Sequence, residues 1–177
     1  LEDDEDSDTV LPIVRRVDDH QNFIPDNLRH RDNFYEYGSD PNRRSEIQLP
    51  TQVPDSLKLA IKCFILTCAV RRLRGHLTAH NSMLVHVSRL IAWQHHIKDL
   101  VESVFDFYRR GIEMNVPSVI EEIRIALEED TDVYKSYRTT SSQILTGRLA
   151  GIDPHIQVHN WSEVLPVLND AASRVIV

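Results

Sequence analysis

Cysteine, glycine and long apolar runs are all scarce in this sequence of 177 residues. The two cysteines, Cys63 and Cys68, lie about 140° apart around a helix axis, so they are not placed to form a disulfide with each other. The longest apolar run, residues 59–70, contains Lys62 and is shorter than the ~20 residues that span a bilayer. A disulfide scaffold is therefore excluded, and we expect a cytoplasmic protein without membrane contacts.

The five glycines are too scattered to form a nucleotide-binding loop. None of them stands in a GxxxxGK or GxGxxG arrangement, the patterns whose backbone amides hold phosphates. A GxSxG turn around a nucleophilic serine is missing as well, and no Asp is followed by Glu-x-Lys on a convincing strand, as a magnesium nuclease requires. We therefore expect this chain to have no cofactor of its own and not to be catalytic by itself.

Composition and charge divide the chain into three parts. With 41% apolar and 27% charged residues, the whole has an ordinary globular composition. Residues 1–8 form an acidic run that we expect to be a tail or linker, and residues 9–50 are an irregular packing segment with four prolines. Residues 51–177 are predicted to form a helix-rich domain. Because the chain begins at Leu1 with this acidic run, we interpret it as a fragment of a longer protein.

Hydrophobic periodicity in the third part predicts helices joined by short strands. Helices are expected at residues 54–74, 89–110, after Pro117, within 134–150 and at 161–172. Gly75 and Gly111 are expected to end the first two helices. Short apolar runs predict strands at residues 83–87, 156–159 and 174–177. The alternation predicts an α/β fold in which short parallel strands pack with several helices.

The distribution of charge is uneven although the net charge is −7. Residues 56–98 contain no acid at all, seven Lys and Arg, and five of the nine histidines. Such an asymmetry points to a surface that faces a polyanion. The predicted nucleic-acid contacts are Arg71, Arg72, Arg74, Arg89 and Lys98. The alternative is that the three arginines near residue 72 only complement the negative end of a helix dipole.

A histidine-rich stretch follows the first predicted helix. His80, Asn81 and His86 are candidate catalytic residues of a histidine nuclease or ligands of a divalent cation. No nearby Cys, Asp or Glu completes a ligand shell, so the sequence predicts no metal site. The alternative is that His86 is a core histidine within an apolar run and that the other two residues form the turn before it.

The same stretch resembles a known family. The tripeptide at 73–75, followed by HNSMLVHVS at 80–88, is similar to the Z-one (Z1) domain, a family often labelled as an endonuclease. The residues that carry the resemblance are Arg74, Gly75, His80, Asn81, Ser82, Met83, His86 and Ser88. The family occurs in large bacterial proteins that look like superfamily II helicases and are encoded beside restriction–modification genes, including DNA methylases and MutL-like ATPases.

The resemblance implies a part of the second RecA-like lobe of a helicase-like ATPase, with ATP and magnesium bound only by the parent protein. The partners that it implies are DNA, the rest of the parent chain and, within the same system, a MutL-like ATPase and a methylase. Three functions stay open at this point. They are a non-catalytic DNA-contacting accessory domain, a protein-interaction module, and a metal-dependent endonuclease that uses His80, Asn81 and His86.

Overall fold

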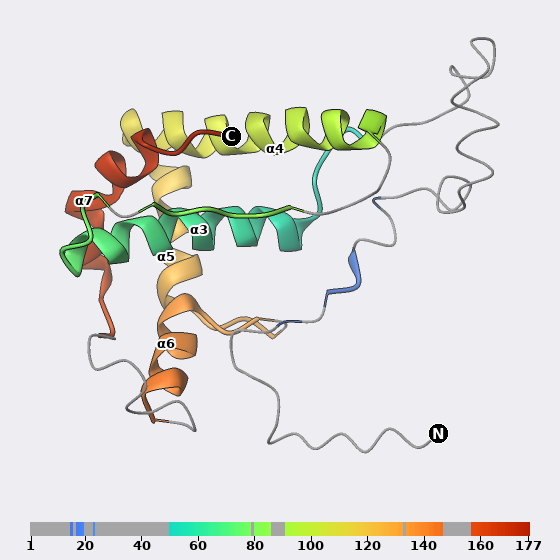
Figure 1. The fold of residues 1–177 in the computed structure, drawn as a ribbon. Coiled ribbons are helices and arrows are strands. Elements are labelled where there is room, and N and C mark those ends of the chain that lie inside the picture. Colours follow the sequence, from blue (N-terminus) through green and yellow to red (C-terminus); the bar gives the residue numbers. More distant parts are fainter. Residues whose placement is uncertain are drawn as a thin grey trace, which may run out of the picture. The chain divides into compact units, whose positions relative to one another are not determined.

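The computed structural model describes residues 15, 17–19, 23, 50–78, 80–85, 91–132, 134–146 and 157–177. The regular secondary structure among these residues is helical, with no strand (Figure 1). The helices are α3 (Asp55–Leu73), α4 (Ile91–Glu113), α5 (Pro117–Glu128), α6 (Tyr137–Thr146) and α7 (Trp161–Ser173). None of them combines the length and the apolar character that a bilayer-spanning segment requires.

The predicted α/β fold with parallel strands is wrong for the described residues. The described parts of the three expected strands, residues 83–85, 157–159 and 174–177, have no strand structure. Strands of a parallel sheet are buried on both faces, whereas Leu84 is 89% and Ile176 is 95% exposed. A short apolar run does not by itself supply a partner strand, so the run was an ambiguous signal. A RecA-like lobe is built on a parallel sheet, so the described residues do not support the implied likeness to such a lobe either.

The first predicted helix is confirmed as α3, and Gly75 ends it as expected. Gly75 has a φ of 82°, a left-handed conformation that glycine adopts without steric strain. Its amide donates to the carbonyl of Arg72 and the next amide, of His76, donates to the carbonyl of Arg71, both at 2.9 Å. These two bonds are a Schellman motif, which satisfies the last carbonyls of the helix.

The prediction that Gly111 ends the second helix is wrong. Helix α4 continues to Glu113, and Asn115 ends it with a φ of 52°. Gly111 lies inside the helix, where an added Cβ would come within 2.6 Å of Val119 Cγ2 on α5. The lack of a side chain at Gly111 therefore allows α4 and α5 to approach closely. The left-handed residue that ends α4 is Asn115, and asparagine is, after glycine, among the residues that adopt this conformation most readily.

The chain forms two compact units, to both of which α3 and α4 contribute. The smaller consists of residues 17–61, 84–107 and 177. In this unit the Asp19 carboxylate accepts hydrogen bonds from the Ser56 amide at 2.8 Å and hydroxyl at 2.7 Å, and so caps the start of α3. His96 Nε2 lies 2.7 Å from the Pro50 carbonyl. Among the described residues of this unit, those that are buried are Phe23, Val53, Ile61, Ile97 and Phe105.

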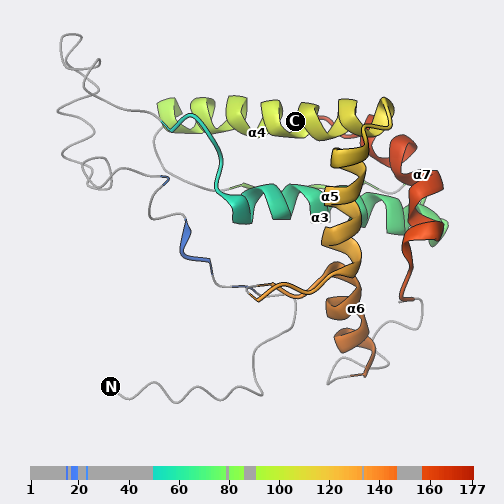
Figure 2. The ribbon, with the colours of Figure 1, turned by 180° about the vertical axis from the view of Figure 1, so that it is seen from behind.

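The larger unit consists of residues 1–16, 62–83 and 108–176. Here α5 contacts both α6 and α7, and in the view from behind α6 follows below α5 while α7 lies beside it (Figure 2). Ile123 and Leu127 of α5 and Val164 and Leu168 of α7 are at most 1% exposed. Burial of such apolar side chains is the main stabilising contribution in a helical unit of this kind.

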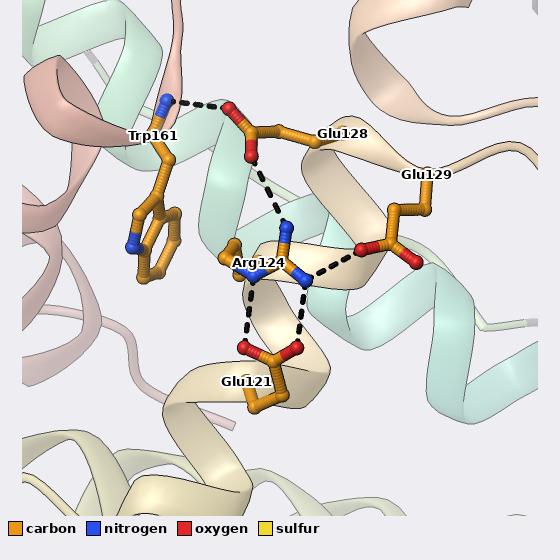
Figure 3. Close-up of polar contacts among 5 residues, drawn as sticks. All are labelled: Glu121, Arg124, Glu128, Glu129 and Trp161. Carbon is orange, nitrogen blue, oxygen red and sulfur yellow. Dashed lines mark hydrogen bonds and ion pairs between the residues drawn. The ribbon is translucent and has the colours of Figure 1, made fainter.

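A charged network joins the end of α5 to the start of α7. Figure 3 shows the Arg124 guanidinium between Glu121, which it binds through two hydrogen bonds of 2.8 and 2.7 Å, and the side chains of Glu128 and Glu129. Glu128 also accepts a 3.0 Å hydrogen bond from the Trp161 amide, the first residue of α7. The carboxylate thereby satisfies a helix-terminal donor. This network has a structural role.

Candidate nucleic-acid interface

One face of α3 carries a polar stripe towards the end of the helix. Cys63, Thr67, Arg71 and Arg74 recur at four- and three-residue spacing and so lie on the same side of the helix. Thr67 Oγ1 lies 3.3 Å from the hydroxyl oxygen of Tyr137, the first residue of α6. The stripe therefore faces the start of α6.

Most cations of the acid-free segment have a carboxylate partner in the fold. Two are lysines at the helix surface, Lys58 with Asp55 at 2.9 Å and Lys98 with Glu102 at 3.2 Å. Lys62 pairs with Glu122 of α5 at 3.4 Å, and Arg72 forms an ion pair with Asp170 of α7.

Arg71 and Arg74 differ from these four residues. Within the described part of the chain, no carboxylate lies within ion-pair distance of either guanidinium. Each has its Nε buried without a hydrogen-bond partner in that part, while Arg74 Nη2 donates to the Gln157 carbonyl at 3.2 Å. A buried donor without an acceptor destabilises a fold by about 1 to 3 kcal/mol. Both side chains are half-buried.

The five predicted nucleic-acid contacts therefore differ in their partners and in their places in the fold. Arg71 and Arg74 lie one turn apart without acidic partners, whereas the Arg72 side chain, 14% exposed, is held by Asp170. Lys98 belongs to the other unit and is paired with Glu102. Arg89 lies outside the described residues. Among the described residues of this set, only Arg71 and Arg74 lie close together without an acidic partner.

The motif segment after α3 contributes Asn81 to the same place. Asn81 is half-buried and hydrogen-bonds with the Cys68 thiol, and the charge of Arg71 acts on that thiol as well. Burial raises the pKa of Cys68, and these two neighbours lower it by less, so the thiol stays protonated at neutral pH. The Asn81 Oδ1 atom is buried and has no hydrogen-bond partner in the described part of the chain. We call Arg71, Arg74 and Asn81 the arginine site.

The other described residues of the motif that follow α3 differ in their exposure. His80 and Ser82 are exposed and Met83 is half-buried, while His86 and Ser88 lie outside the described residues. The proposed grouping of His80, Asn81 and His86 therefore stays a prediction. No group of three or more metal-ligating side chains occurs within the described ranges.

Two contributors to the region were not selected by sequence analysis. Tyr137 contacts the stripe from α6, and Gln157 accepts the hydrogen bond of Arg74 with its backbone carbonyl. Burial raises the pKa of Tyr137 above the usual value of a phenol. Neither residue has a periodic or motif signal, because both contacts join segments that are far apart in the sequence.

Comparison with known proteins identifies the chain at the level of a family. The model of the Z1 domain matches residues 56–177, which extend from the start of α3 to beyond α7. No curated protein and no solved structure matches the chain.

Proposed function

The chain belongs to the Z1 domain family, and on this premise we propose that it is a non-catalytic accessory domain of a DNA-processing, helicase-like ATPase of a restriction–modification system. In this role the arginines at the end of α3 contact the phosphate backbone of DNA. Such contacts hold a protein on DNA without reading its sequence.

The observation that carries this proposal is the lack of acidic partners at Arg71 and Arg74. The other described cations of the acid-free segment are neutralised within the fold, so these two are the ones left to attract an anion. A guanidinium stays charged at any pH that a protein tolerates, and it is the side chain best suited to phosphate oxygens.

A second candidate function, a protein-interaction module, is favoured by two apolar side chains that flank the motif segment. Leu77 is 56% and Leu84 is 89% exposed. In this role the segment docks onto the rest of the parent chain. The module then forms a stable complex with that chain and has no affinity for DNA.

The experiment is a fluorescence-anisotropy titration of a labelled duplex with the full chain, repeated from about 50 to about 200 mM salt. The test variant carries Arg71→Gln and Arg74→Gln. The matched control carries Arg110→Gln and Arg138→Gln, which remove two charges from exposed arginines of α4 and α6. We expect the affinity of the test variant to fall about tenfold and that of the control by less than about twofold.

Two results would contradict the accessory role. Undetectable binding of the unmodified chain at low salt would favour the interaction module instead. Equal losses in the test and control variants would show that net charge alone drives the binding. Addition of manganese to the same mixtures tests the endonuclease label, because metal-dependent nicking that His80→Ala abolishes would establish a catalytic role.

A further inference from the structure

We propose that Arg71 and Arg74 form one site for a single phosphate group of the DNA backbone, so that the two arginines act as one clamp and not as two separate contacts. The inference rests on the proposed function, because it names the group through which that function binds DNA.

The first argument is the spacing and the fixed position of the two arginines. Residues three apart on a helix have Cβ atoms about 5 to 6 Å apart, so Arg71 and Arg74 project side by side. Their Nε atoms are buried, and Arg74 is held by the Gln157 carbonyl at 3.2 Å. The stems are thus anchored by the protein, and little side-chain freedom remains to be lost on binding.

The second argument is chemical complementarity. No carboxylate in the described part of the chain pairs with either guanidinium, and because both Nε atoms are buried, the Nη groups are the donors that remain for an external anion. Asp170, which pairs with Arg72 of this turn of α3, is also bound by Arg174 at 3.2 Å. A phosphate group brings oxygen acceptors with the negative charge that the site lacks, in a geometry that a guanidinium fork matches.

The slope of log affinity against log salt distinguishes one clamp from two contacts. Each phosphate that a protein neutralises on duplex DNA contributes about 0.9 to this slope. We expect Arg71→Gln with Arg74→Gln to reduce the slope by about 0.9, since one phosphate is lost. Two independent contacts predict a reduction of about 1.8, a result that would overturn the clamp and leave the proposed function standing.

A charge-preserving variant guards against a variant that fails to fold. Arg71→Lys with Arg74→Lys keeps both charges but removes the forked donors. The clamp predicts an unchanged slope with a lower affinity, and an unchanged affinity would overturn it. If the unmodified chain does not bind DNA at all, the proposed function and the clamp fail together. Thermal unfolding of each variant shows that the compared proteins are folded.

Discussion

Two arginine-containing regions of the larger unit are built in opposite ways. On α5, Arg124 is bound by the carboxylates of Glu121, Glu128 and Glu129 (Figure 3). At the end of α3, Arg71 and Arg74 have no such partner within the described ranges. The same side chain is therefore neutralised within the fold in one region and, among the described residues, keeps its charge without a carboxylate partner in the other.

The difference originates in the local sequence. The three glutamates lie three, four and five residues from Arg124, within reach along one helix. Residues 56–98 contain no acid, so a cation of α3 can be neutralised only by a distant element. Arg72 finds Asp170 of α7 and Lys62 finds Glu122 of α5, whereas the face with Arg71 and Arg74 meets a tyrosine and a backbone carbonyl.

The largest expected effect is a loss of packing between α4 and α5, which leaves the arginine site intact. Gly111→Ala places a methyl group 2.6 Å from Val119 Cγ2 and should destabilise the fold by about 1 to 3 kcal/mol. At a helix position with free space, a change from Gly to Ala stabilises the protein. The sign of the change in unfolding free energy therefore shows whether the space beside residue 111 is occupied. The measurement is chemical denaturation, with DNA affinity unchanged at temperatures where the variant is folded.

The control for this prediction relieves the contact from the other side. Val119→Ala removes the two methyl groups at 2.6 and 2.7 Å but leaves Cβ at 2.8 Å, so the double variant should lose less stability than the sum of the two single changes. A Gly111→Ala protein as stable as the unmodified chain would contradict the close approach of α4 and α5.

The next effect makes the arginine site resemble the α5 region. Asn81→Asp supplies Arg71 with an internal carboxylate, which competes with phosphate for the guanidinium, and we expect DNA affinity to fall about tenfold. The matched control is Ser82→Asp, the same charge change at the neighbouring exposed residue. Equal losses in the two variants would indicate general repulsion and would argue against a defined site at Asn81.

The smallest expected effect is a loss of stability at low pH, which depends on a carboxylate of the fold and not on the arginine site. The Asp130 carboxylate accepts a 2.9 Å hydrogen bond from the Ser136 amide and pairs with Lys135, and these contacts hold its pKa well below the usual range. A carboxylate with a lowered pKa stabilises the fold above its unfolded pKa of about 3.9, and this contribution is lost as the pH falls below that value. Arginines do not titrate in this range.

The test compares thermal unfolding of the unmodified chain and Asp130→Asn at neutral pH and towards about pH 3. The variant should unfold at a lower temperature at neutral pH and should lose less stability on acidification. Asp132→Asn, at a neighbouring exposed acid, is the control. Parallel acid curves for the unmodified chain and Asp130→Asn would refute the role of this carboxylate.

Local patterns in the sequence were sufficient for several helices and for one helix end. The apolar spacing and Pro117 predicted α5, and Gly75 predicted the end of α3, because these signals act over a few residues. Gly111 carried the same local signal and was misinterpreted, since its meaning depends on Val119 of the next helix. The predicted strands were wrong because a strand exists only with a partner, and short apolar runs do not contain that information.

The sequence by itself determined where the acids are absent, which cations cluster near residue 72, and the resemblance to the Z1 family. Only the tertiary structure decided which of the described cations have an acidic partner. Arg72 and Arg71 are adjacent in the chain but project to different sides of α3, and only the first meets an aspartate of α7. Neutralisation of a charge depends on what lies within a few ångströms, and for an acid-free segment that is set by packing between distant elements.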